Sequence, residues 1–353
     1  MPGTAGFDRQ LSEYRKLPVF LLPMKRISVG ILCASIVLFS PLEPRCDDKP
    51  LKQVSLVTLW LPQSQFAGYY VAREKDIYKK YGLDVTIIDG GPDHPPFKLL
   101  EEGKAEFAVI WLSTAIEKKS QGIGLVNISQ VVQKSGLMLV AKKSSGILKP
   151  QDLNNKKVGL WDADFEIQPR AFFKKYGLNV KVVPQSYTVN LFLRDGVDAA
   201  SAMWYNEYHT IINSGYDPDE LTTFFFYEHG LNSPEDGIYA LEKTADSDPA
   251  TCRAFATASL EGWKYAFEHT EEAVEIVLRY MEKAHLPANR VHQRWMLERM
   301  KDLILVNGVY QGMGGLSQGD YSKVANGLRE SGLIKEIPDF NKFYKNCDSN
   351  DKK

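Results

Sequence analysis

A chain of 353 residues, with 44% hydrophobic and 25% charged residues and a formal net charge of −1 at pH 7, has an ordinary globular composition. It is long enough for two domains or for one large unit of two lobes. Because basic residues are not in excess, the composition argues against binding to nucleic acid or to an anionic membrane.

Near the N-terminus, a short basic start precedes an apolar segment. Met24 opens the sequence MKR, which is followed by ISVGILCASIVLF. A helix that crosses a bilayer needs ~20 residues, so this shorter run is typical of a secretory signal peptide. We therefore predict export to the periplasm, with 1–46 holding the signal and the segment upstream of it. SPLEPRC shows no clear cleavage site, and a lipid anchor at Cys46 is the disfavoured alternative.

From residue 51 onward, segments typical of strands and of helices alternate. The first block reads as the strand QVSLVTLW, the helix SQFAGYYVAREKDIYKKYG, the strand LDVTIID, a short helix in HPPFKLLEEGKA, the strand EFAVIW and the helix STAIEKKSQG. Two further strands are expected in LVNISQVVQKSGLMLVAKK. Alternation at these lengths predicts βαβ units and a mostly parallel sheet.

The pattern then restarts and ends in a helical region. After the second block comes one more strand, in PEDGIYALEK, and then helices with no sheet of their own. We predict an α/β fold of two lobes, each a mostly parallel sheet flanked by helices, with the C-terminal helices packed on lobe 1. Lobe 1 is expected to comprise 47–143 and 232–353, and lobe 2 to comprise 144–231.

Four of the six tryptophans directly follow, or end, a run typical of a strand: Trp60, Trp111, Trp161 and Trp204. In open parallel sheets, ligands bind outside the carboxyl ends of the strands. Two lobes that face each other would each bring a pair of indoles to one cleft, which suits a flat, unsaturated ligand. Aromatic pairs contribute ~0.5–1.5 kcal/mol beyond burial. For any one of these residues, packing in the core is the alternative.

Polar residues and glycines flank these tryptophans, and we expect them to select the ligand. The remaining predicted contacts are Gln65, Tyr69, Gly90, Gly91, Asp162, Glu166, Tyr205, Asn206, Glu207 and Glu228. The two glycines offer backbone N–H groups after the second strand, although a plain turn explains them equally well. Acidic groups beside aromatic faces favour a ligand with N–H donors over a sulfonate or a nitrate.

No catalytic motif is present. The sequence has no GxSxG elbow, P-loop or HExxH, and no GxGxxG after a strand, and its six histidines fall in no metal-ligand spacing. We therefore predict a protein that is not an enzyme and that needs no cofactor or metal. In an exported protein, Cys252 and Cys347 either form a disulfide or remain thiols, and both readings stay open.

Several stretches resemble the NMT1/THI5-like group of periplasmic solute-binding proteins. They are LWLPQSQFAGYYVAREKDIYKKYGLDVTIIDGG, ISQVVQKSGLMLVAKKSSGILKPQDLNNKKVG, MWYNEYHTII and EDGIYALEK, and the resemblance covers roughly 51–305. It implies a hinged, two-lobed periplasmic-binding-protein fold of type II that delivers a small molecule to the permease of an ABC importer. Relatives include binders of thiamine pyrimidine precursors, of riboflavin and of aliphatic sulfonates.

The same group includes the fungal pyrimidine synthase, which consumes its own histidine and pyridoxal phosphate. That histidine lies in the loop after the first strand, where PQSQFAG has none, and the enzyme's CCCFC run is missing. We therefore predict a binder of a thiamine-related aminopyrimidine, with riboflavin as the next choice. The alternatives are such a synthase, a sulfonate or taurine binder, for which Arg170 and Arg194 are poorly placed, and a ligand-sensing module.

Overall fold

The computed structural model describes residues 50–345. The predicted signal peptide, the alternative lipid anchor at Cys46 and one partner of the possible disulfide, Cys347, lie outside these residues. Cys252 is buried, and both readings, a disulfide with Cys347 or free thiols, stay open. Within 50–345, the helices are all too short or too polar to span a membrane.

The first sheet contains five strands in the order β2-β1-β3-β10-β4. Their bounds are β1 (Lys52–Val57), β2 (Leu83–Ile88), β3 (Phe107–Trp111), β4 (Leu125–Gln130) and β10 (Asp236–Leu241). β1 pairs in parallel with β2 and β3, whereas β10 lies between β3 and β4 and is antiparallel to both. Four strands therefore point the same way, and the inserted strand runs against them.

The second sheet repeats this arrangement, in the order β7-β6-β8-β5-β9. Its strands are β5 (Leu137–Lys142), β6 (Lys157–Leu160), β7 (Lys181–Pro184), β8 (Ala199–Met203) and β9 (Leu221–Phe225). Here β5 is the strand that runs against the others, antiparallel to β8 and β9. The predicted fold class is thus confirmed, with one reversed strand in each mostly parallel sheet.

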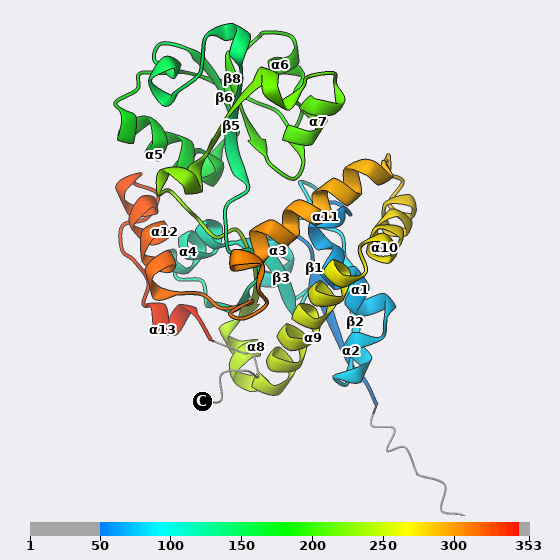
Figure 1. Ribbon diagram of the computed structural model, residues 1–353. Helices are drawn as coiled ribbons and strands as arrows, with labels where there is room; N and C mark the ends of the chain where they lie inside the picture. Colours follow the sequence, from blue (N-terminus) through cyan, green and yellow to red (C-terminus); the bar gives the residue numbers. More distant parts are fainter. Residues whose placement is uncertain (1–49, 346–353) are drawn as a thin grey trace, which may run out of the picture. The chain divides into compact units, whose positions relative to one another are not determined.

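The reversed strands are the two that the chain enters on crossing from one sheet to the other (Figure 1). A chain that leaves one sheet at its carboxyl edge and enters the next at the facing edge must run against the other strands. β5 belongs to the second sheet, although 47–143 was expected to form part of lobe 1. The division of the chain into lobes at 143 and 231 stays a prediction.

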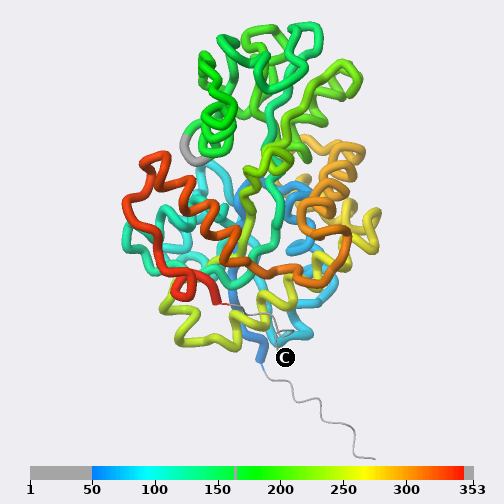
Figure 2. Tube along the Cα trace, turned by 60° about the vertical axis from the view of Figure 1, so that its left-hand side comes forward, coloured from blue at the N-terminus to red at the C-terminus, as the bar shows by residue number. Residues whose placement is uncertain are grey.

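Helices surround the sheets, and the C-terminal ones pack on the first lobe, as expected (Figures 1 and 2). The helices are α1 (Ala67–Glu74), α2 (Ile77–Lys80), α3 (Pro96–Glu101), α4 (Leu112–Ser120), α5 (Ile167–Tyr176), α6 (Asn190–Leu193), α7 (Glu207–Asn213), α8 (Glu242–Ser247), α9 (Pro249–Glu268), α10 (Thr270–Lys283), α11 (Arg290–Ile304), α12 (Gln318–Glu330) and α13 (Phe340–Phe343). Among them, α9 packs on α1, α12 on α4 and α13 on β4.

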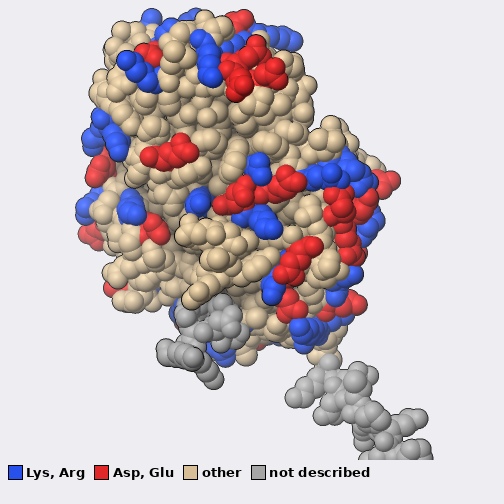
Figure 3. All heavy atoms as spheres, in the orientation of Figure 1, with Lys and Arg blue, Asp and Glu red and all other residues tan. Residues whose placement is uncertain are grey.

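On the face shown in Figure 3, basic and acidic side chains are interspersed. This face has no broad surface of one sign that would attract a polyanion. The view agrees with the composition, which argues against a nucleic-acid partner.

Two glycines bring the backbones of α1 and α9 into contact. A Cβ atom added to Gly262 would lie 2.2 Å from the carbonyl oxygen of Gly68, and one added to Gly68 would lie 2.3 Å from the indole of Trp263. The segment that carries Trp60 and the turn Ser64–Phe66 lead directly into α1, so this contact also helps to fix their position.

We predict that Gly262→Ala lowers the free energy of unfolding by about 1–3 kcal/mol, because the new methyl group must push the two helices apart. Urea denaturation measures this change. Gly319→Ala is the matched control, since Gly319 is an exposed helical glycine whose nearest neighbour to an added Cβ is 3.7 Å away. Equal destabilisation by the two substitutions would contradict the close approach of the helices.

Candidate functional site

The chain crosses between the sheets twice, from β4 to β5 and from β9 to β10, and hydrogen bonds join these two crossovers. Val132 N–H donates to the carbonyl of Asp236 at 2.9 Å, and Ser135 N–H donates to Asn232 Oδ1 at 3.0 Å. The buried carboxylate of Glu235 accepts from Ser135 Oγ and from Gly136 N–H, both at 2.8 Å. This clamp fixes where β5 and β10 begin, at the edges by which the two sheets face each other.

Aromatic side chains bridge the two lobes beside this clamp. Phe165, in the 3₁₀ turn Ala163–Glu166, lies between two of the predicted indoles, with ring centroids 4.4 Å from Trp111 and 5.7 Å from Trp161. Trp60 contacts Tyr187 of the second lobe at 5.0 Å. Trp60 and Trp111 thus contact aromatic side chains of the second lobe, and Trp161 reaches Trp111 only through Phe165.

Trp204 lies in a different contact. Its ring is 5.3 Å from that of Phe225, and the guanidinium of Arg299 lies 4.9 Å from its centroid. Its carbonyl accepts a hydrogen bond of 3.1 Å from Trp295 Nε1. Trp204 therefore lies against α11, and its part in ligand binding stays a prediction.

Some of the buried polar atoms without a hydrogen bond of good geometry lie near the clamp, and others are spread over both lobes. Those near the clamp, among the described residues, are the hydroxyl of Tyr69, Trp111 Nε1 and Asp236 Oδ1, although Trp111 lies close enough to Asp236 to lower the pKa of its carboxyl. Asp236 pairs with Trp111 in the register of β10 with β3, and its other oxygen accepts from Gln65 Nε2 at 2.8 Å. An unsatisfied buried group costs ~1–3 kcal/mol, so a cluster of them is typical of a binding site.

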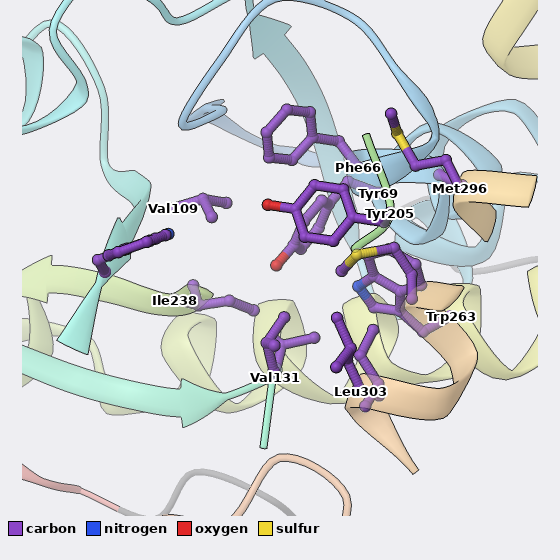
Figure 4. Close-up of a cluster of buried hydrophobic side chains, with 14 of the residues drawn as sticks. Phe66, Tyr69, Val109, Val131, Tyr205, Ile238, Trp263, Met296 and Leu303 are labelled. Carbon is purple, nitrogen blue, oxygen red and sulfur yellow. The ribbon is translucent and has the colours of Figure 1, made fainter. Parts of the chain in front are cut away.

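Tyr205 brings the second lobe into the same cluster. Figure 4 shows its ring beside that of Tyr69, with Phe66, Val109 and Ile238 of the first lobe around it. Burial, followed by the charges of nearby acids, raises the pKa of both tyrosines well above the ordinary value. Both hydroxyls therefore stay protonated and can donate hydrogen bonds.

The acids of this region have pKa values raised to about neutrality or above, so they are only partly ionised near pH 7. Burial raises the pKa of Asp236 to about 7 and that of Glu235 to about 8, where the charge of Asp236 adds to the effect of burial. Burial likewise raises the pKa of Glu207 to about 7. The region is therefore less negative near neutral pH than its composition suggests, and Asp236 can either accept or donate a proton.

The side chains of Asn206 and Glu207 make hydrogen bonds to each other and to the backbone. Asn206 Nδ2 donates to Glu207 Oε1 at 2.9 Å, and Glu207 Oε2 accepts from Met203 N–H at 3.0 Å. Gly90 is buried, and a Cβ there would lie 1.8 Å from the carbonyl oxygen of Thr58, so close packing requires glycine.

The remaining predicted contacts lie apart from the polar cluster. Gly91 has φ +120° and is buried in the turn after β2. Asp162 and Glu228 are exposed, and Glu166 pairs with Arg170. For these residues too, contact with a ligand stays a prediction.

Asp236, Glu235 and Phe165 were absent from the predicted site. The predicted contacts follow strands, whereas Asp236 begins an antiparallel strand and so reaches the same edge from the opposite direction. Two adjacent acids before the apolar run GIYAL were the available signal. Nothing in DADFEIQP marked Phe165 as the residue that would lie between two indoles.

No group of three or more metal-ligating side chains is found within residues 50–345. A surface pocket of about 510 Å³ lies along α9, where Tyr81, Tyr265 and Tyr310 form part of its wall. None of the predicted ligand contacts lines this pocket.

Comparison with known proteins gives a family match and several relatives. The model of the family described as "NMT1/THI5 like" matches residues 63–273, more than half of the chain. A putative thiamine biosynthesis protein of Haemophilus influenzae is 25% identical over 80% of this chain and 88% of its own. A formylaminopyrimidine-binding protein of Halalkalibacterium halodurans is 22% identical, over 68% and 74%. Riboflavin-binding protein RibY of Chloroflexus aurantiacus is 20% identical, over 84% and 86%.

Solved structures share the fold at lower identity. The periplasmic aliphatic sulphonate binding protein SsuA of Escherichia coli superposes with a TM-score of 0.63 at 14% identity, over 82% of this chain and 96% of its own. A putative sulfonate ABC transporter protein of Methylobacillus flagellatus gives 0.62 at 14%, over 84% and 92%. A pyrimidine phosphate synthase of Saccharomyces cerevisiae, THI5, is 23% identical but covers only 42% of each chain.

We predict that Asp236→Asn raises the free energy of unfolding by about 1–3 kcal/mol more at about pH 8 than at about pH 5. A raised pKa means that the native carboxyl resists ionisation, so the wild type loses stability as pH rises from the unfolded value of 3.8 through about 7. The amide removes this loss. Urea denaturation at the two pH values measures it, with the exposed Asp219→Asn as control. An equal change at both pH values would contradict a neutral buried Asp236.

Proposed function

This chain belongs to the NMT1/THI5-like family, and from that premise we propose that it is the solute-binding protein of an ABC importer. Its ligand is a planar heteroaromatic nutrient, first of all a thiamine-related aminopyrimidine and next riboflavin. The protein acts in the periplasm, where it binds the nutrient between its lobes and delivers it to a membrane permease. The fold, which is that of binding proteins from such importers, supports this proposal.

The observation that carries the choice of ligand is the buried cluster of Tyr69, Trp111 and Asp236. None of these three atoms makes a hydrogen bond of good geometry, and the indole N–H of Trp111 lies close enough to the carboxyl of Asp236 to lower its pKa. An aminopyrimidine complements this set, because its ring nitrogen accepts a hydrogen bond while its exocyclic amine donates one to the carboxylate. The neighbouring indoles provide faces for stacking on a flat ring.

The same cluster disfavours an anionic ligand. It contains no lysine or arginine, and two acids, Glu235 and Asp236, lie at its base. A sulfonate would have to leave water without gaining a cationic partner, which is costly in a buried site. Such a small set of polar groups also matches a single ring better than riboflavin, which carries a polyhydroxyl chain. The names of the relatives are compatible with both heteroaromatic classes.

Binding closes the lobes by differential affinity. A ligand held between Trp111 of the first lobe and Trp161 of the second contacts both only when they are together, so it shifts the equilibrium toward the closed form. Phe165 lies between the same two indoles, and a bound ring would replace it there. The other sequence-predicted contacts are proposed as secondary contributors.

We predict that a formylaminopyrimidine quenches the tryptophan fluorescence of the full chain and that riboflavin binds more weakly. Asp236→Asn should weaken binding by about 10- to 100-fold at about pH 8, where the carboxyl of Asp236 is ionised, because a hydrogen bond to a charged group contributes ~1.5–3 kcal/mol. Calorimetric titration measures the dissociation constants, and mass spectrometry of small molecules released from the purified protein identifies the ligand directly.

Asp219→Asn, at an exposed acid outside the region, is the matched control and should bind as the wild type does. Binding of an alkanesulfonate without binding of any heteroaromatic compound would overturn the choice of ligand. Retention of pyridoxal phosphate, detected by its absorbance, together with formation of a pyrimidine product on addition of iron, would instead establish the synthase.

A further inference from the structure

Helix α11 belongs to the C-terminal part of the chain, yet it contacts the second lobe directly. Besides its bond to the carbonyl of Trp204, Trp295 stacks on His209 of α7, with centroids 4.8 Å apart and planes inclined by 10°. The guanidinium of Arg299 lies 4.9 Å from the ring of Trp204 and 4.7 Å from that of Trp295. One turn of α11 therefore provides a stacked contact between the lobes.

A pair of histidines completes this contact. The Nδ1 atoms of His209, on α7, and His292, on α11, lie 2.9 Å apart. His292 Nε2 lies 3.0 Å from Asn206 Oδ1, and Asn206 in turn donates to Glu207. A continuous chain of hydrogen bonds thus passes from the second lobe to the first and back again.

The hydrogen bonds of Asn206 assign the protons. Because its Nδ2 donates to Glu207, its Oδ1 must accept from His292, whose Nε2 therefore carries the hydrogen. The Nδ1 of a neutral His292 is then bare, and it accepts from Nδ1–H of His209. Asn213 Nδ2 lies 3.2 Å from the same His209 atom. Only one proton fits between the two imidazoles.

Most charged groups of the packed elements are paired with one another. Glu207 and Tyr208 lie on α7. On α11, Arg299 pairs with Asp302 and lies 4.0 Å from Glu298, and Lys301 is the basic residue of the last turn. The pairs Arg290–Glu275 and Arg294–Glu271 join α11 to α10, and Glu261 of α9 pairs with Lys80. The turn Ser64–Phe66 brings only uncharged side chains to α11. Glu207, which follows Asn206 in the chain, is held by hydrogen bonds from Met203 N–H and Asn206 Nδ2.

We propose that His292, Trp295 and Arg299 form a latch, the α11 latch, which holds the two lobes together without ligand while the facing histidines share one proton, and which releases when both histidines are protonated. In the doubly protonated state, two N–H groups would face each other at the distance of a hydrogen bond. The two cations would also repel each other in a partly buried site. The latch acts on closure and touches none of the polar cluster at Asp236.

The protonation equilibria give the sign of the effect. Burial, then the charge of His209, lowers the pKa of His292 to about 4, and burial lowers that of His209. Separation of the lobes exposes both rings and restores ordinary values near 6.5. Closure is therefore unaffected above about pH 6.5 and weakens by up to about tenfold per pH unit for each proton taken up below it.

Small-angle X-ray scattering of the ligand-free full chain tests the latch. We expect the wild type to be compact at about pH 7.5 and to have a larger radius of gyration at about pH 5. The double variant His209→Gln/His292→Gln, whose side chains cannot become charged, should lose this pH dependence. His269→Gln, at an exposed histidine outside the latch, is the matched control and should expand as the wild type does.

A second variant separates release from acid unfolding. His292→Lys places a permanent charge in the latch and should expand the protein at about pH 7.5, with far-ultraviolet circular dichroism unchanged. The proposal is overturned if the wild type has the same radius at both pH values, if the double variant expands as much as the wild type, or if His292→Lys stays compact. Because no ligand is added, these outcomes do not depend on whether the proposed ligand is right.

Discussion

The clamp around the carboxylate of Glu235 is the interaction on which the arrangement of the lobes depends. Its acceptor atoms hold Ser135 and Gly136, the last residues before β5, while its own backbone precedes β10. Both crossing strands are thereby fixed at one place, where the chain passes between the sheets. Because Asp236 directly follows Glu235, this clamp also fixes the position of Asp236 in the polar cluster.

The same region contains several buried polar groups that lower the stability of the folded protein. A buried acid pair, together with an indole N–H and a tyrosine hydroxyl that make no hydrogen bond of good geometry, lies close to the clamp. Buried groups of this kind lower stability, and the ligand proposed above would satisfy them. The tightly packed glycines of α1 and α9, a short distance away, provide a rigid support for this unsatisfied cluster.

Much of the fold could be predicted because its signals are local. The alternation of strands and helices, and the indoles that end β3 and follow β6, are readable from short windows of sequence. The direction of β5 and β10 could not be, since it depends on where the chain enters a sheet rather than on the residues of the strand. Asp236 was missed for that reason. The surroundings of Trp204 depend on α11, which lies far along the chain, and no short window contains both.

The two sheets share one strand order, but they differ in which part of the chain supplies their strands. All five strands of the second sheet come from one uninterrupted stretch, β5 to β9, whereas the first sheet needs β10 between β3 and β4. A nascent chain emerges N-terminus first. The strands β1 to β4 are therefore synthesised before β10, the interior strand that lies between β3 and β4, and the second sheet can assemble in the meantime. The first lobe is therefore the first to begin synthesis and the last to complete its sheet. Until β10 is added, the facing edges of β3 and β4 are unpaired and are the part of the chain most exposed to aggregation.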